Sequence, residues 1–262
     1  MDNVKIRDVL SFLQDFVDAK KPASTIRGVK AALMRQFAFF QREDVMNSFL
    51  VKLHVQGAQK LAPIPETKLF IWDPEIPLKY IANRPRPNDF LNAGKEALLL
   101  TILATGMRVD CASKLSKVIT IRNEISVIPF LLARKTGISS PQLLKPYDVN
   151  ERICPVKAIH HFLSLGRRIR QVGEKFLFIS SRGNRAHVDT LRHWVTDLLE
   201  ESGVKASAGS CRSAATSAAF LRELPIDVIL KAAGWAREST FRKYYQRLVH
   251  SGLEGVNLMP VI

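Results

Sequence analysis

Apolar residues recur with the period of an amphipathic helix along the N-terminal part of the chain. One stripe consists of Val9, Leu10, Leu13, Phe16 and Val17. Pro22 interrupts the pattern, and a second helical segment runs from Ile26 to Phe40. Apolar positions spaced by three and four residues share one face of a helix. The pattern therefore predicts consecutive helices from about Lys5 to Gly57, packed as a small all-α domain.

Prolines are concentrated in the next part of the chain. They occur in three short stretches, Leu61-Ala-Pro-Ile-Pro-Glu, Trp72-Asp-Pro-Glu-Ile-Pro and Arg84-Pro-Arg-Pro-Asn. Proline cannot donate a backbone hydrogen bond inside a helix, and it stiffens a connection. We therefore expect a link at about residues 60–86, with an N-terminal helical domain at residues 1–84 and a second domain at residues 85–262.

The second domain shows patterns of both helices and strands. A helix is expected at residues 92–105, with Gly106 at its end, and a short helix at 108–115. Alternating apolar residues at 118–122 and 125–130 indicate two strands joined by a turn. Further helices are expected at 155–165, at 190–201 and from 209 to about 250, with breaks at Pro225 and Gly234. The expected fold class is mainly α with a small antiparallel β-sheet.

The composition adds a strong positive charge to this picture. The 262 residues include 39 Lys and Arg against 24 Asp and Glu, a net charge of +15, and 47% of them are hydrophobic. Basic side chains attract nucleic acid because they release its condensed counterions. Most of the excess lies after Arg84. A nucleic acid is therefore the expected partner, and a basic surface that only aids solubility is the alternative.

Several classes of protein fit the sequence poorly. The three cysteines are an odd number without C-x-x-C spacing, which indicates neither a disulfide framework nor a zinc site. The start of the chain lacks the apolar run of a signal peptide, and the longest apolar stretch, Ala97–Ala104, is too short to cross a bilayer. No P-loop, dinucleotide-binding glycine pattern or H-E-x-x-H is present. We expect a soluble intracellular protein with no metal, no cofactor and no membrane partner.

Cleavage of a phosphodiester without a metal requires positive donors for the non-bridging oxygens, an acid for the leaving oxygen and a nucleophile. Residues of these types occur in three stretches: Ala97-Leu-Leu-Leu-Thr-Ile-Leu-Ala-Thr-Gly-Met-Arg108, Ser210-Cys-Arg-Ser-Ala-Ala-Thr-Ser-Ala-Ala, and Ile229-Leu-Lys-Ala-Ala-Gly-Trp-Ala-Arg-Glu-Ser-Thr-Phe-Arg-Lys-Tyr-Tyr245. In this order and at these separations they resemble the tyrosine recombinase family. The resemblance is greatest to the recombinases of DIRS-like, Ngaro-like and crypton mobile elements, and it covers nearly the whole chain.

The resemblance implies a role for each matching residue. Arg108 and Arg212 would clamp the scissile phosphate, since a guanidinium group binds two oxygens and stays charged; surface ion pairs are the alternative. Trp235 would pack against the site and offer its indole N–H, although core packing alone would also explain it. Tyr245 matches the nucleophile of the mobile-element branch, and Tyr244 its buried neighbour. The spacing found in bacterial and phage relatives points instead to Tyr244. Adjacent helical residues lie about 100° apart, so one phenol at most can face the phosphate.

The remaining positions of the expected site match the family less completely. The family places a lysine on a β-hairpin as the general acid, and Lys135 matches it, with Arg134 and Lys145 as further candidates and a solvated loop as the alternative. The family usually carries a histidine three residues before its second arginine, whereas this chain has Gly209 there. Glycine offers a backbone N–H and no imidazole. The histidines that could replace it are His187, His193 and His250.

The resemblance implies a site-specific recombinase of a mobile element that cuts and rejoins duplex DNA through a 3′-phosphotyrosine intermediate. It also implies a tetramer on DNA that exchanges C-terminal tails, and a location in the nucleus. Candidates for DNA contacts in the first domain, where a solvated helix face is the alternative, are Lys20, Lys21, Arg27, Lys30 and Arg35. Two other functions stay open: a recombinase-derived DNA-binding protein without catalysis, suggested by Gly209, and a helix–turn–helix regulator that uses residues 229–241.

Overall fold

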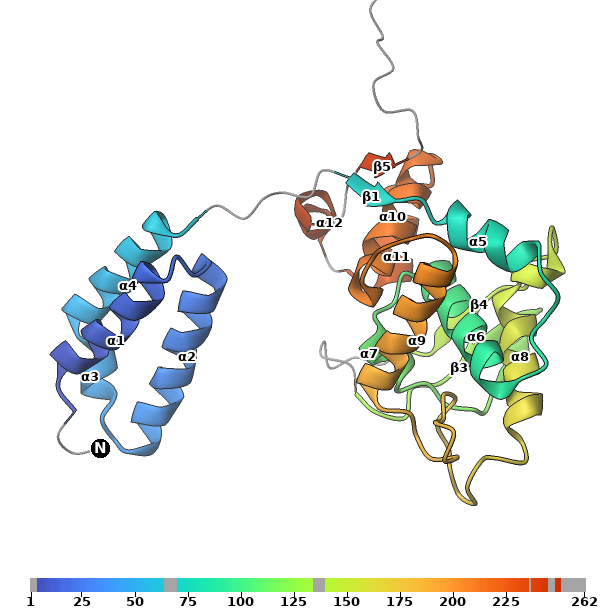
Figure 1. Cartoon of the computed structure of the whole chain (residues 1–262), viewed down its shortest axis with the longest axis horizontal. Coiled ribbons are helices and arrows are strands. Elements are labelled where there is room, and N and C mark those ends of the chain that lie inside the picture. Colours follow the sequence, from blue (N-terminus) through green and yellow to red (C-terminus); the bar gives the residue numbers. More distant parts are fainter. Residues whose placement is uncertain (1–3, 64–69, 134–139, 236, 245–247, 251–262) are drawn as a thin grey trace, which may run out of the picture. The chain divides into compact units, whose positions relative to one another are not determined.

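The chain forms two compact units, Met1–Thr67 and Lys68–Ile262 (Figure 1). The computed structural model describes residues 4–63, 70–133, 140–235, 237–244 and 248–250. The division between Thr67 and Lys68 lies within the link that the sequence predicts at about residues 60–86. The later part of that link packs into the second unit, where Trp72, Leu78 and Ile81 join its hydrophobic core.

The first unit is all-helical, as the hydrophobic pattern predicts. Its helices are α1 (Ile6–Asp18), α2 (Ala23–Phe39), α3 (Glu43–Asn47) and α4 (Phe49–Leu61). Leu13 of α1, Ile26 and Phe37 of α2 and Val51 of α4 are buried together in one core. The hydroxyl of Ser48 caps α4 by accepting a hydrogen bond from the Val51 N–H at 3.3 Å.

The second unit contains eight α-helices among the described residues. They are α5 (Glu75–Ala82), α6 (Phe90–Thr105), α7 (Val109–Ala112), α8 (Pro155–Gly166), α9 (Val188–Glu201), α10 (Cys211–Leu221), α11 (Ile226–Ala233) and α12 (Glu238–Tyr244). Two 3₁₀ turns accompany them, η1 (Glu151–Ile153) and η2 (Ala208–Ser210).

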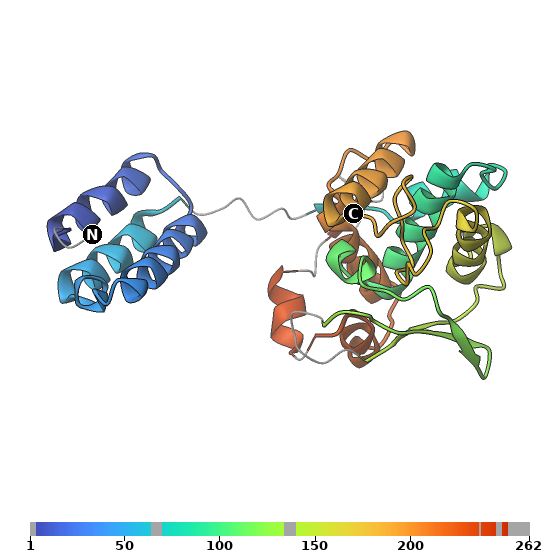
Figure 2. The same ribbon diagram turned by 90° about the horizontal axis from the view of Figure 1, so that it is seen from below.

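Helix α6 is the centre of this unit (Figures 1 and 2). Its residues from Ala93 to Ile102 are all buried, and it packs against α8, α9 and α10. A side chain at Gly94 would meet both neighbours, because its Cβ would lie 2.7 Å from the ring of Trp194 on α9 and 2.9 Å from that of Phe162 on α8. The absence of a side chain at this position lets the three helices approach one another.

The strands form two small sheets. Strands β2 (Thr120–Arg122), β3 (Ile125–Ile128) and β4 (Gln142–Leu144) make an antiparallel sheet in that order, while β1 (Phe70–Trp72) pairs in parallel with β5 (Leu248–His250). The β2–β3 turn has positive φ at Asn123 and Glu124, 47° and 63°, as a two-residue hairpin of the I′ type requires. Helices with a small antiparallel sheet confirm the expected fold class.

One element differs from the expectation. Residues 248–250 were expected to end the last helix, whereas they form strand β5. The reason is long-range pairing, since Phe70, Ile71 and Trp72 of β1 lie opposite Leu248, Val249 and His250. A periodic pattern within a short segment cannot reveal a partner strand so far away in the chain. Of the helices that the structure describes, none has the length and apolar character needed to cross a bilayer.

A buried ionic cluster links Glu96 of α6 to Arg84 and to Arg152 of η1. The Glu96 side chain is 2% exposed and accepts hydrogen bonds from both terminal nitrogens of Arg152, Nη1 and Nη2, at 2.6 Å each. The Nη2 of Arg84 donates to the same carboxylate at 3.1 Å. Removal of one partner from a buried ion pair leaves the other charge uncompensated, which costs far more than the loss of a surface pair.

We expect Glu96→Ala to destabilise the second unit by about 3–5 kcal/mol, because two arginines would then lose their buried carboxylate. All three tryptophans of the chain lie in this unit, so urea unfolding can be followed by their fluorescence. The control is Arg192→Ala on α9, which breaks a pair with Asp189 whose arginine is 57% exposed and should cost less than about 1 kcal/mol. Equal losses of unfolding free energy in the two variants would contradict the conclusion that Glu96 forms a buried ionic cluster.

Candidate active site

The turn after α6 presents Arg108. Gly106 ends the helix in the left-handed conformation, with φ of +61°. A Cβ at this position would lie 3.2 Å from Cγ2 of Thr216 on α10 and 3.7 Å from Cβ of Ala233 on α11. The turn therefore lies directly against α10 and the end of α11. Arg108 follows it as the exposed residue that precedes α7.

Arg212 is the second residue of α10 and is 4% exposed. Its Nη2 donates a hydrogen bond to the backbone carbonyl of Ala233 at 2.7 Å. Its guanidinium carbon also lies 4.3 Å from the centroid of the Trp235 ring, a geometry in which the π-system stabilises the cation. Trp235 thus both packs in the interior and holds an arginine in place.

Ala233 connects the two arginines. It faces the Gly106 turn that leads to Arg108, and its carbonyl accepts the hydrogen bond from Arg212. Thr216 makes a second connection, since its methyl group faces Gly106 and its hydroxyl donates to the carbonyl of Arg212 at 2.7 Å. The structure therefore brings together two segments that are far apart in the sequence.

The turn η2 precedes Arg212 and carries Gly209. This glycine is exposed, and a Cβ on it would meet nothing closer than the Ser207 hydroxyl at 3.9 Å. Ser210 is held by the indole N–H of Trp72, which donates to its Oγ at 2.7 Å. The site has room for a side chain at position 209, where the family has histidine.

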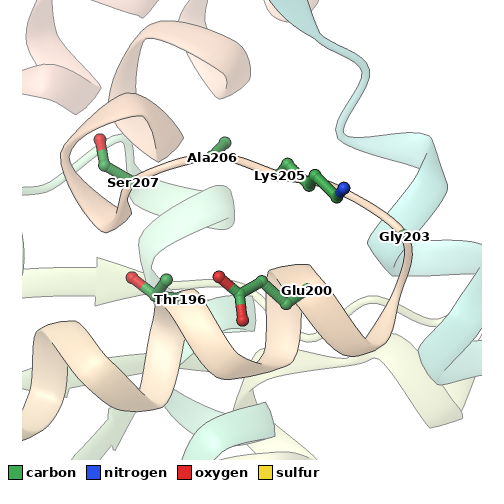
Figure 3. A pocket seen from close by; sticks show the side chains of 6 residues that line it. All are labelled: Thr196, Glu200, Gly203, Lys205, Ala206 and Ser207. Carbon is green, nitrogen blue, oxygen red and sulfur yellow. The ribbon is translucent and has the colours of Figure 1, made fainter.

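The loop that leads into η2 borders an open hollow of about 670 Å³ above α9 (Figure 3). The loop contributes Gly203, Lys205, Ala206 and Ser207, and α9 contributes Thr196 and Glu200. Figure 3 shows Ser207 at the η2 end of this hollow.

Helix α12 ends at Tyr244, the first of the two candidate tyrosines. Phe241 is fully buried, with its ring centroid 5.6 Å from that of Phe220 on α10 and 5.7 Å from that of Trp235. Tyr244 is the last residue of the helix, three positions after Phe241. Tyr245 lies outside the described residues. Phe241 therefore packs α12, the helix that ends at Tyr244, against Trp235 and α10.

The remaining candidates for general acid or base are placed as follows. Lys135 and Arg134 lie outside the described residues, and Lys145 is exposed directly after β4. His193 is exposed on α9. His187 is exposed at the start of α9, about 20 Å from the end that leads into η2, since each helical residue advances 1.5 Å. His250 lies in β5 opposite Trp72.

The five basic candidates of the first unit lie on its surface or near it. Lys20 and Lys21 are exposed between α1 and α2, and Arg27 and Arg35 are exposed on α2. Lys30 is half-buried. These residues are available for phosphate contacts.

Neither a thiol nor a metal offers an alternative centre among the described residues. Cys111, Cys154 and Cys211 are buried, and burial raises the pKa of Cys211, next to Arg212, to about 12. This thiol stays protonated and is a poor nucleophile. Within the described ranges, no three His, Cys, Asp or Glu side chains are grouped as metal ligands would be.

Four supporting residues were not recognised in the sequence: Trp72, Thr216, Ala233 and Phe241. Trp72 lies in a proline-rich stretch, and no local pattern indicates its partner Ser210, which lies 138 positions away. Thr216 and Ala233 are small residues on helices, and their spacing carries no signal of the contact with Gly106. Phe241 matches an ordinary core position in a helical pattern.

Comparison with known proteins shows the fold. No family model matches the sequence, and no curated protein matches it significantly. Solved structures do match. A XerH site-specific recombinase bound to a palindromic difH substrate is 18% identical, with a TM-score of 0.67 over 93% of this chain and 69% of that one. A lambda integrase dimer bound to a COC′ core site is 14% identical, with a TM-score of 0.61 over 100% of this chain and 68% of that one.

An integrase of the Tn1549 transposon, in complex with circular-intermediate DNA, has a TM-score of 0.56 at 14% identity over 93% of this chain and 81% of that one. At such identities the likeness concerns the fold. The chain therefore has the fold of the tyrosine recombinases.

We expect Gly106→Ala to cost about 1–2 kcal/mol for the left-handed backbone and about 1 kcal/mol more for the contact with Thr216. Gly203→Ala is the control, because Gly203 has φ of +89° and nothing within 4 Å of its Cβ position. In a Thr216→Ser background, which removes Cγ2 and keeps the hydroxyl, the additional cost should disappear. If urea unfolding shows the same loss for both glycine variants in both backgrounds, the proposed packing of the turn is wrong.

Proposed function

We propose that this chain is a site-specific DNA recombinase or integrase that cleaves and rejoins duplex DNA through a 3′-phosphotyrosine intermediate. The observation that carries the proposal is the position of Ala233 between the Gly106 turn and the Arg212 side chain. This contact joins the turn that presents one arginine to the helix that carries the other. Two arginine segments held together in this way suit the binding of one phosphate.

The two arginines supply charge for the transition state. Attack on a phosphodiester increases the negative charge on the non-bridging oxygens, and preorganised cations stabilise that charge most when they need not move. Arg212 is held by Ala233 and Trp235, so its position is set before DNA binds. Arg108 is exposed at the start of α7 and can reach a phosphate from solvent.

The nucleophile in this proposal is Tyr245. An ordinary phenol has a pKa near 10 and is a poor nucleophile at neutral pH, so the phosphate-bound arginines must stabilise the developing phenolate. Its 3′-phosphotyrosine bond conserves the energy of the phosphodiester, so that religation needs neither nucleotide nor metal. Lys135 would protonate the leaving 5′ oxygen. The burial of Phe241 supports the assignment by fixing the helix that ends at Tyr244.

The finer features of the function follow from the resemblance. The first unit would contact duplex DNA through Lys20, Lys21, Arg27, Lys30 and Arg35. The net charge of +15 of the whole chain, most of it after Arg84, supports DNA binding by the protein. Four chains would assemble on DNA, each passing its C-terminal tail to a neighbour. The protein would belong to a mobile element and act in the nucleus.

Gly209 favours a second candidate, a recombinase-derived DNA-binding protein without catalysis. General acid–base help is worth about 10²–10⁴-fold, and glycine has no side chain to supply it. The arrangement of α11, Gly234 and α12 also leaves a helix–turn–helix regulator to be tested, since Gly234 forms a left-handed turn with φ of +67° between two helices. A regulator of that kind would require neither Arg108 nor a tyrosine.

A nicked suicide substrate distinguishes these functions, because loss of the short fragment traps any covalent protein–DNA adduct. We expect the wild-type chain to form an adduct that resists denaturation. Tyr245→Phe should abolish it while DNA binding and the unfolding transition stay unchanged, since the loss of one hydroxyl removes the nucleophile. Tyr244→Phe is the matched control and should retain the adduct.

The opposite pattern would assign the nucleophile to Tyr244. Adducts that persist in both single variants but vanish in the double variant would mean that either phenol reaches the phosphorus. If wild-type protein binds the substrate and forms no adduct, the chain is a DNA-binding protein and the proposed catalysis is wrong.

A further inference from the structure

Trp72 makes a long-range contact with the turn that precedes Arg212. Its indole N–H donates to the hydroxyl oxygen of Ser210 at 2.7 Å. The same hydroxyl donates to the carbonyl of Ser207 at 2.6 Å, and the Ser210 N–H donates to that carbonyl at 2.9 Å. Ser210 thus uses its hydroxyl both as acceptor and as donor, and the indole fixes its direction.

The turn needs such support because of Gly209. Glycine has more backbone freedom than any other residue, and a 3₁₀ turn has weaker hydrogen-bond geometry than an α-helix. Gly209 is exposed, and a Cβ built on it would meet nothing closer than 3.9 Å. Arg212 follows in the first turn of α10, so that motion of η2 would be transmitted to the start of that helix.

The strand that carries Trp72 also holds the segment after the tyrosines. Backbone pairing sets Phe70 opposite Leu248 and Trp72 opposite His250. Both strands lie beside α10 (Figure 1). Strand β5 begins four positions after Tyr244. Strand β1 therefore contacts the turn before Arg212 through Trp72, and it pairs with β5, the strand that follows the tyrosines.

We propose that Trp72 is a positioning residue for DNA cleavage: it holds the turn that contains Gly209 against β1, and so sets the position of Arg212 relative to β5, the strand that follows the tyrosines. This inference rests on the proposed function, since it concerns the geometry of that same site. Core packing alone is the alternative, because Trp72 also contacts the hydrophobic core of its unit. A positioning role depends on the indole N–H, whereas core packing depends on the volume of the ring.

Trp72→Phe separates these roles, since phenylalanine keeps an aromatic ring and lacks the N–H donor. We expect single-turnover cleavage of the suicide substrate to fall about five- to tenfold, the scale of one net hydrogen bond, while the DNA dissociation constant changes by less than about twofold. Amide hydrogen exchange at residues 207–212 should accelerate by about the same factor as cleavage slows.

The matched control is Trp194→Phe. Trp194 is a core residue of α9 whose ring packs against Phe90 and Phe162. This variant should lower stability yet leave both the cleavage rate and the exchange at 207–212 unchanged.

A second substitution tests the mechanism by rescue. Gly209→Ala restricts the turn without meeting a neighbour, because nothing lies within 3.9 Å of its Cβ position. In the Trp72→Phe background it should restore cleavage by about two- to fivefold, by limiting the same backbone freedom that the indole limits in the wild type.

Two outcomes would overturn the inference while leaving the proposed function intact. One is a Trp72→Phe protein that cleaves as fast as an active wild type. The other is slower cleavage with unchanged exchange at 207–212 and no rescue by Gly209→Ala. If the wild type itself forms no adduct, the proposed function fails first and the positioning role fails with it.

Discussion

The close packing of Gly106 against Thr216 and Ala233 is the contact on which the rest of the site depends. It requires a residue without a Cβ, both because φ is +61° and because a Cβ would lie 3.2 Å from Thr216. Arg108 follows this turn, and Arg212 donates to the carbonyl of Ala233. The contact that packs the end of α6 against α10 and α11 is therefore also the contact that joins the two arginine segments.

Aromatic packing extends this arrangement to α12, the helix that ends at Tyr244. The Arg212 guanidinium packs on the Trp235 indole, which in turn packs on Phe241, a buried residue of α12. Groups held by core packing need little reorganisation when charge develops, and for this reason a static site can stabilise a transition state. The Trp72 indole adds a hydrogen bond to Ser210, the residue after the exposed Gly209.

Local signals predicted much of the fold. The sequence predicted a helix at residues 92–105, close to the observed α6, and Gly106 ends that helix because glycine adopts the left-handed conformation without strain. The pairing of β1 with β5 and the packing of Trp72, Leu78 and Ile81 into the second unit were not predicted, since both depend on contacts with residues far away in the chain. Resemblance indicated Arg108, Arg212 and Trp235, but the role of Ala233 between them appears in the structure alone. The assignments of Lys135 and Tyr245 stay predictions, because both residues lie outside the described ranges.

Single-turnover cleavage of DNA with a methylphosphonate at the scissile position tests most directly whether Arg108 and Arg212 neutralise one and the same phosphate. The methyl group replaces a charged non-bridging oxygen, so the transition state carries less negative charge. On ordinary DNA, Arg108→Ala and Arg212→Ala should each cleave at least about a hundredfold more slowly than wild type. On at least one methylphosphonate diastereomer each deficit should shrink to about tenfold or less. An undiminished deficit on both diastereomers would show that the arginines act elsewhere and would contradict the account.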